Sequence, residues 1–148
     1  ESFYISQPTL IYGKGIGEGN HTRPLNEIVW FEENVLCQNI NNLEQTTSGR
    51  DFSAEAETKG AVPKGARAIY ATIEGKAATV GSGNALYVKP YTALYGTSEQ
   101  MLQIRAQVSN VSVTNSGWIS LGEDGAFSLD ADHTFTGVSM YIHGYQLY

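Results

Sequence analysis

Residues 134–148, TFTGVSMYIHGYQLY, are the stretch that decides the fold. From Val138 onward the side chains alternate, with Val138, Met140 and Ile142 on one face and Ser139, Tyr141, His143, Tyr145 and Leu147 on the other. Alternation with a period of two, in a run rich in β-branched and aromatic residues, is typical of a β-strand. Chain ends are ordered only where something holds them. The stretch therefore predicts a central strand of a β-sandwich.

Three more alternating runs, at residues 66–75, 86–91 and 101–114, predict further strands, the last broken in two near Ser109 and Asn110. A strand with one buried face is fixed in register, because a slip of one residue exposes its whole apolar set. The inward positions of these runs and of the last strand predict a core made of Ile69, Ile73, Leu86, Val88, Leu102, Ile104, Val108, Val138, Met140 and Ile142.

The remaining segments are less regular. Residues 28–31 predict a strand, residues 32–34 a bend and Val35 the start of another strand, whereas residues 39–60 are polar and predict loop with one strand near residues 52–56. Residues 62–65, with Pro and Gly, predict a turn. The Asp-Gly pair in residues 122–125 predicts a hairpin between residues 118–121 and 126–129.

These segments together predict an all-β fold, an antiparallel β-sandwich of jelly-roll-like type with about eight strands. A chain of 148 residues is expected to form one domain. We assign the sandwich to residues 25–148 and an N-terminal arm with a glycine-rich loop to residues 1–24.

Charge and composition exclude several partners. The formal net charge is −6, which disfavours contact with nucleic acid phosphates. No apolar run approaches the roughly 18 residues that a membrane-spanning helix needs, so membrane insertion is not expected. Glu1 is not an initiator residue, which indicates processing or an excised domain. Cys37 is the single cysteine and is expected to be a small buried apolar side chain.

No motif for catalysis or cofactor binding stands out. Residues 13–20 are glycine-rich but match neither the phosphate loop nor the dinucleotide loop. The chain lacks a nucleophile elbow, and its histidines have no metal-ligand spacing. We therefore expect no cofactor, no metal and no catalytic residues, and the acids near residue 127 are interpreted as solvated turn residues. These histidines and acids are His21, His133, His143, Glu123, Asp124, Asp130 and Asp132.

The aromatic residues are the better candidates for a binding site. Tyrosine and tryptophan are favoured at interfaces because one end of each side chain is apolar and the other polar, and tryptophan can stack on sugars. Ordinary packing on a sheet face is the alternative interpretation for each of them. The candidate binding residues are Trp30, Tyr70, Tyr87, Tyr91, Trp118, Tyr141 and Tyr145.

The N-terminal segment predicts self-association. Two short apolar pieces are separated by Pro8 and lack the alternation that would place them in the domain's own sheet. Homo-oligomers with closed cyclic symmetry are the common way to bury such surface. The predicted contact residues are Phe3, Tyr4, Ile5, Leu10, Ile11 and Tyr12.

Three segments, residues 62–68, 118–127 and 141–145, together resemble the β-sandwich domains of bacteriophage virion appendages and other viral surface proteins. The resemblance covers residues 62–148, and residues 1–60 have no counterpart in it. It implies a structural or receptor-binding role at the virion surface, outside the cell, usually as a trimer. It implies no catalytic residues.

These observations lead to three hypotheses. The first is a phage structural domain, in a spike, fibre tip or capsid decoration, that contacts other virion proteins and a host glycan or receptor. The second is a carbohydrate-binding module of a secreted bacterial protein. The third is a small glycoside hydrolase, because its two catalytic acids need not be close in sequence.

Overall fold

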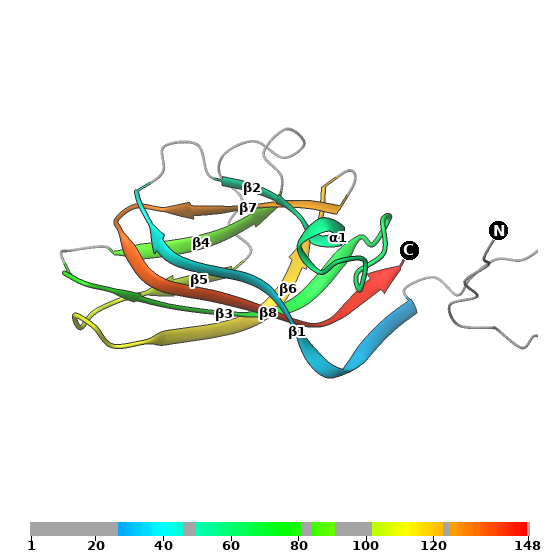
Figure 1. Cartoon of the computed structure of the whole chain (residues 1–148), viewed down its shortest axis with the longest axis horizontal. Helices are drawn as coiled ribbons and strands as arrows, with labels where there is room; N and C mark the ends of the chain where they lie inside the picture. Colours follow the sequence, from blue (N-terminus) through cyan, green and yellow to red (C-terminus); the bar gives the residue numbers. More distant parts are fainter. Residues whose placement is uncertain (1–26, 46–49, 81–83, 91–101, 123–124, 148) are drawn as a thin grey trace, which may run out of the picture.

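The computed structural model describes residues 27–45, 50–80, 84–90, 102–122 and 125–147. They form two four-stranded antiparallel sheets, which lie one above the other in Figure 1. Sheet A has the order β1 (Glu27–Leu43), β8 (Phe135–Leu147), β3 (Ala68–Ala77), β6 (Val113–Ser120); sheet B has β2 (Arg50–Ser53), β7 (Ala126–Ala131), β4 (Ala85–Pro90), β5 (Leu102–Arg105). The predicted all-β sandwich is confirmed, and β8 is an interior strand of sheet A.

The strand pairing identifies the sandwich as a jelly roll. The first strand pairs with the last, the second with the seventh, the third with the sixth and the fourth with the fifth, all antiparallel. Additional pairing of β8 with β3 and of β7 with β4 completes each sheet. The eight strands therefore form four nested antiparallel pairs divided between two sheets, which is the eight-stranded arrangement of jelly-roll domains.

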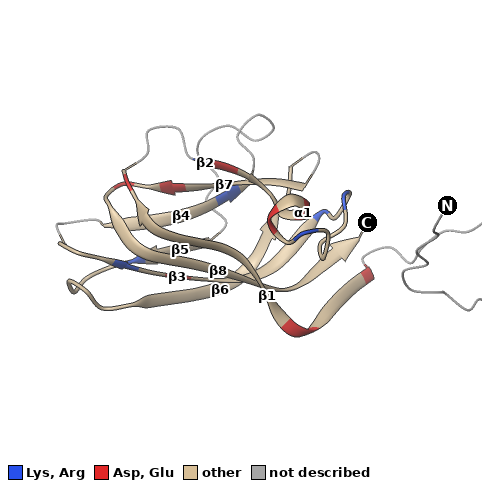
Figure 2. Ribbon diagram, viewed as in Figure 1, with Lys and Arg blue, Asp and Glu red and all other residues tan. Residues whose placement is uncertain are grey.

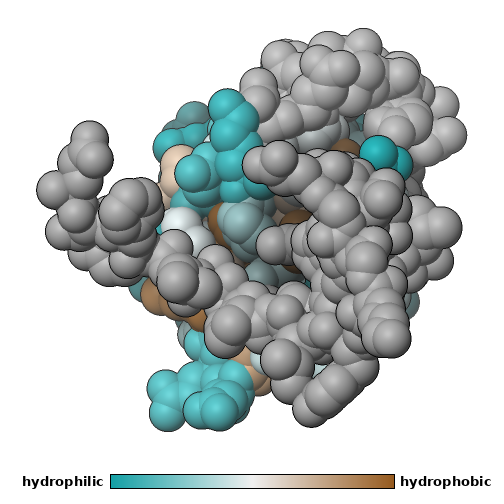
Figure 3. All heavy atoms as spheres, turned by 90° about the vertical axis from the view of Figure 1, so that its right-hand side faces the viewer, coloured by the Kyte–Doolittle hydropathy of each residue, from teal (hydrophilic) through white to brown (hydrophobic). Residues whose placement is uncertain are grey.

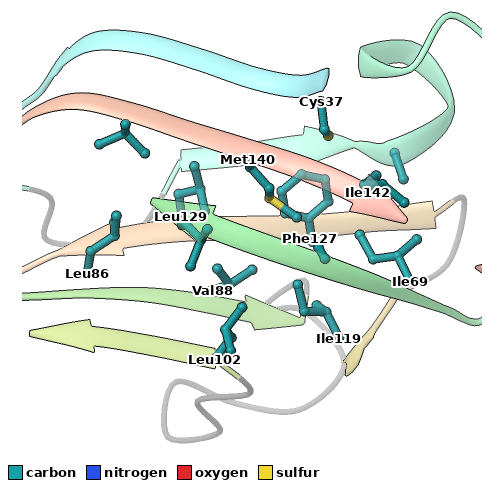
Figure 4. Close-up of a cluster of buried hydrophobic side chains, with 14 of the residues drawn as sticks. Cys37, Ile69, Leu86, Val88, Leu102, Ile119, Phe127, Leu129, Met140 and Ile142 are labelled. Carbon is teal, nitrogen blue, oxygen red and sulfur yellow. The ribbon is translucent and has the colours of Figure 1, made fainter. Parts of the chain in front are cut away.

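The core lies between the two sheets. Strand β3 alternates buried and half-buried residues along its whole length, so Ile69, Ala71 and Ile73 face sheet B. Side chains from both sheets meet in Figure 4, where Phe127 of sheet B lies close to Met140 and Ile142 of sheet A. Of the ten predicted core residues, nine are buried: Ile69, Ile73, Leu86, Val88, Leu102, Ile104, Val138, Met140 and Ile142.

Val108 is the exception, with 59% of its surface exposed. Strand β5 ends at Arg105, and Ala106 is the last buried residue of this run. The chain then crosses from sheet B to β6 in sheet A. The alternation in the sequence continues past the point where the strand stops, so the prediction for Val108 is wrong.

The predicted hairpin between residues 118–121 and 126–129 is also wrong. A local turn is present, because the Gly125 N–H donates to the Gly122 carbonyl and the Gly122 N–H to the Ala126 carbonyl. However, β6 pairs with β3 in sheet A, whereas β7 pairs with β2 and β4 in sheet B. The turn therefore passes the chain between sheets. Glu123 and Asp124 lie outside the described residues.

The polar segment after residue 39 contains more structure than the sequence predicts. Strand β1 continues to Leu43, and the chain from Ala54 to Glu57 is the short helix α1 rather than a strand. Ser53 caps α1, and the Thr58 hydroxyl bonds both the Ala54 carbonyl and the Val62 N–H. The predicted turn that follows is confirmed, with Gly65 at a φ of 95° and a bond from the Ala66 N–H to the Pro63 carbonyl.

Strand β8 contains a β-bulge that reverses its alternation. Pairing advances by one residue on β3, from Tyr70 to Ala71, while it moves by two on β8, from Gly144 to Ile142. His143 is therefore an extra residue, and a bulge of this kind exchanges the two faces for the residues beyond it. Tyr145 pairs with the inward Ile69 and is only 8% exposed, so the predicted placement of Tyr145 and Leu147 beside Tyr141 on the outer face is wrong.

Strand β1 bends opposite this bulge. Its pairing with β8 shifts between Trp30 and Val35, which leaves residues 31–34 as an excursion from the ladder. The predicted bend is confirmed, although both halves belong to one strand. A second shift lies between Leu36 and Gln38, where Cys37 is buried as predicted. Burial raises the pKa of the Cys37 thiol to about 12, with a further contribution from the charge of Glu57.

Two valines provide a matched test of this fold. Val88→Ala removes two methyl groups from a fully buried site and is expected to lower the free energy of unfolding by about 2 kcal/mol. Val108→Ala is expected to change it by no more than about 0.5 kcal/mol, because Val108 is exposed. Urea unfolding followed by circular dichroism measures both, and equal losses would contradict the end of β5 at Arg105.

Candidate functional site

The outer face of sheet A carries a concentration of exposed apolar side chains. Residues that pair across the four strands form rows perpendicular to the strands. We define the aromatic face as the outer side of the rows that begin with residues Ile28 to Leu36 of β1 and continue through their partners on β8, β3 and β6. Trp30 is 57% exposed, Tyr141 37% and Trp118 36%. Large exposed apolar patches mark interaction sites on soluble proteins. The outward apolar side chains are Ile28, Trp30, Leu36, Tyr70, Trp118 and Tyr141.

Three rings of this face contact one another. The ring centroids of Trp30 and Tyr70 are 5.6 Å apart, those of Tyr70 and Trp118 5.5 Å, and those of Trp30 and Trp118 5.8 Å. The planes meet at 74°, 65° and 56° respectively. Such separations are typical of edge-to-face contact. The three rings therefore form one cluster in which each ring contacts the other two.

Gly144 allows this cluster to form. It lies between Trp30 and Tyr70 in the same row of the sheet. A Cβ at this position would lie 2.5 Å from the Val29 carbonyl oxygen and 2.8 Å from Cε3 of Trp30. The Trp30 indole on β1 therefore occupies the space that a side chain of β8 would fill. In this position it crosses β8 and contacts Tyr70 on β3.

A row of hydrogen-bonded polar groups runs beside the rings. Nδ1 of His143 is 2.6 Å from Oδ1 of Asn34, and Nε2 is 2.7 Å from the Thr72 hydroxyl, which is 2.6 Å from the Ser116 hydroxyl. We define Asn34, His143, Thr72 and Ser116 as the polar row. Since an amide oxygen only accepts, Nδ1–H donates to Asn34 and Nε2 accepts from Thr72. The bulge in β8 and the bend in β1 bring His143 and Asn34 together.

The polar row has some of the groups of an acyl-transfer site. A hydroxyl, an imidazole and an amide stand in the order of a nucleophile, a base and an orienting group. A tetrahedral intermediate also needs free N–H donors close to the nucleophile. Thr72 lies on β3, whose backbone is paired with β6 on one side and with β8 on the other. Its neighbouring N–H groups therefore serve the sheet, and the hydroxyl is shared with Ser116.

The paired residues of the aromatic face include no carboxylate, lysine or arginine, because Glu32 and Glu33 lie in the bend that leaves the ladder. In Figure 2 the strands of sheet A are mainly tan, with acidic residues at the start of β1 and at its bend. The bend contains Glu32 and Glu33, both exposed, and Glu74 lies beyond Thr72 on β3. Figure 3, which views the end of the sandwich where β8 finishes, shows hydrophobic residues at the surface beside hydrophilic ones. Arg67 is exposed directly before β3, and Lys76 lies beyond Glu74, so the face is neutral with charges of both signs around it and two acids at the bend of β1.

The structure separates the other predicted binding residues. Tyr87 is half-buried on sheet B, where Nζ of Lys89 lies 5.4 Å from its ring centroid. Tyr145 is in the core, against Phe31. Tyr91 and the predicted arm contacts Phe3, Tyr4, Ile5, Leu10, Ile11 and Tyr12 lie outside the described residues, as does the glycine-rich loop. Trp30, Tyr70, Trp118 and Tyr141 are therefore the predicted residues that the fold brings together.

Two of the predicted turn acids have structural partners. Asp130 forms an ion pair with Lys89 across strands β7 and β4. Oδ1 of Asp132 accepts from the Ala85 N–H at 2.6 Å, which fixes the start of β4. In the part of the chain that the structure describes, no cluster of three or more metal-ligating side chains occurs. None of the described helices is long and apolar enough to cross a membrane.

A second surface feature lies at the far end of β6. It is a hollow of about 360 Å³ lined by Arg105, Gln107, Val108, Val111 and Val113. Val113 begins β6 and Trp118 lies near its end, so this hollow and the aromatic face are separate.

The sequence did not reveal the polar row or the role of Gly144. The partners in the row are 44, 71 and 109 residues apart in the chain, and only the strand pairing brings them together. The fold and the face define a jelly-roll domain with a neutral aromatic surface. Comparison of the sequence with protein-family models and with curated proteins finds no match.

Replacing Gly144 tests how the cluster is built. Gly144→Ala is expected to destabilise the domain by about 1–3 kcal/mol, because the new Cβ meets the β1 backbone at 2.5 Å. It should also move the indole of Trp30 and so change the tryptophan fluorescence. Ser139→Ala, at an outward position of the same strand, is the control. Unchanged stability and fluorescence in Gly144→Ala would contradict the close contact of Trp30 with β8.

Proposed function

We propose that this chain is a non-catalytic structural domain of a virus particle, of the phage spike, fibre tip or decoration type, and that it attaches to a host surface glycan through the aromatic face. The observation that carries the proposal is the pair of exposed indoles, Trp30 and Trp118, in contact on a neutral sheet face. Jelly rolls are common among viral capsid and lectin domains. This fold-level analogy supports the class of protein, and the face supports the activity.

The exposure of Trp30 supports a binding role rather than a structural one. The core is complete between the sheets, and Trp30 projects away from it. Its ring is nevertheless held against Tyr70 and Trp118, so little ordering of the side chain would be needed on contact with a ligand. An exposed aromatic side chain that is already fixed in position is a suitable surface for stacking a sugar ring.

A carbohydrate-binding module of a secreted bacterial protein is the second candidate, because the same indole pair supports it. The gene distinguishes the two: virion genes beside it favour the viral domain, and a catalytic domain in the same reading frame favours the module. A glycoside hydrolase has less support. Glu32 and Glu33 are adjacent at one border of the face, whereas hydrolysis needs two carboxyl groups on either side of the bond to be cleaved.

Glycan attachment predicts a specific loss in tryptophan variants. Trp30→Ala and Trp118→Ala are each expected to weaken binding to bacterial surface polysaccharides by about two- to twelvefold, because stacking contributes about 0.5–1.5 kcal/mol per ring. Tyr87→Ala, on sheet B, removes an aromatic ring from the other side of the sandwich and should leave binding unchanged. Binding by affinity electrophoresis that is equal in all four proteins would exclude the aromatic face as the attachment site.

The proposal includes self-association into a closed homo-oligomer, and the resemblance to appendage domains favours three copies. Deletion of residues 1–12 is expected to give a monomer that keeps its β-sheet circular dichroism spectrum, because the described sandwich begins at Glu27. Light scattering of the intact and shortened chains measures the change. A monomer for the intact chain at micromolar concentration would contradict this part of the proposal.

A further inference from the structure

We infer that the ligand of the aromatic face is a neutral glycan, with its sugar rings on Trp30 and Trp118 and its hydroxyl groups on the polar row. The inference rests on the proposed attachment function and adds the charge class of the ligand and the way it lies on the sheet. Three observations support it: the spacing of the two rows, the chemistry of the polar row and the charges around the face.

The two rows run side by side across the strands. Tyr70 in the aromatic row and Thr72 in the polar row are two residues apart on β3, which corresponds to about 7 Å along a strand. A pyranose ring has apolar faces of C–H groups and a rim of hydroxyl groups. A sugar that stacks on the aromatic row therefore directs part of its rim toward the polar row.

The polar row can match hydroxyl groups without any charge. Hydroxyl groups of a sugar both donate and accept, as do those of Thr72 and Ser116. Asn34 and Ser116 form the two exposed ends of the row, and the bonds within the row leave unused the amide N–H groups of Asn34 and a lone pair of Ser116. The row thus offers donors at its Asn34 end and an acceptor at its Ser116 end, beside the rings.

The paired rows of the face favour a neutral sugar over an acidic one. An acidic glycan would lose water from its carboxylate on a surface whose rows contain no lysine or arginine to pair with it. Glu32 and Glu33, beside Asn34 at one end of the polar row, would repel it. A neutral glycan meets neither penalty.

A second copy of the chain is a poorer occupant of this face. A second copy that covered the face as far as the bend of β1 would bury Glu32 and Glu33 against rows that offer no cation. Two carboxylates per copy would then be desolvated without partners, and unpaired buried charges are costly. The exposed polar row would also be covered by apolar groups, which would leave its ends without hydrogen bonds.

The test uses two series of oligosaccharides of equal length, one neutral and one carrying uronic acid or sialic acid residues, titrated into the full chain by isothermal calorimetry. We expect the neutral series to bind at least tenfold more tightly than the acidic series. Thr72→Val, which keeps the shape of the side chain and removes the hydroxyl, should weaken neutral binding severalfold. Thr114→Val, an outward threonine on β6 opposite Glu74, is the matched control and should have no effect.

Each outcome decides a different point. Tighter binding of the acidic series that still depends on Trp30 would overturn the inference and leave the attachment function intact. Equal affinities of Thr72→Val and Thr114→Val would remove the polar row from the site. If neither series shows binding that depends on Trp30, the attachment function itself is rejected. Light scattering in which Trp30→Ala dissociates an oligomer would instead assign the face to contact between copies.

Discussion

One extra residue in a central strand determines which side chains face the solvent in sheet A. His143 has no counterpart on β3, so β8 continues beyond it with the opposite alternation. Tyr145 consequently enters the core, where its ring centroid lies 5.7 Å from that of Phe31. Gly144 turns outward instead, and its missing side chain leaves room for Trp30. The core at one end of the sandwich and the candidate site both depend on this bulge.

The bulge also explains why polar and aromatic residues meet. It directs the imidazole of His143 between Thr72 on β3 and Asn34 in the bend of β1. Its ring centroid is 5.8 Å from that of Tyr70, so the same side chain belongs to the edge of the ring cluster. Bulges are frequent next to functional sites because they redirect a side chain without disrupting the sheet. In this domain the redirected side chain connects the two rows of the face.

The sequence predicted the parts of the fold that follow from strict alternation. Strand β3 has no irregularity in its burial pattern, and its inward residues were identified correctly. The errors occur where a pattern of period two carries no information. Val108 continues the alternation after β5 has ended. The turn at Gly122 and Gly125 has the same sequence pattern whether it joins strands of one sheet or of two. The bulge at His143 has no sequence pattern of its own. The aromatic composition of the site was visible, but its assembly depended on pairing between distant strands.

The pairing of the first strand with the last has a consequence for how the chain acquires its structure. Glu27 pairs with Leu147, so the contacts that complete sheet A join residues from opposite ends of the domain. Folds dominated by such distant contacts form slowly, because a long loop must close before the contacts stabilise it. During synthesis, β1 and β3 have no β8 between them until residues 135–147 have left the ribosome. Their unpaired edges are open to other chains in that interval, and a high local concentration of nascent chains would therefore promote aggregation.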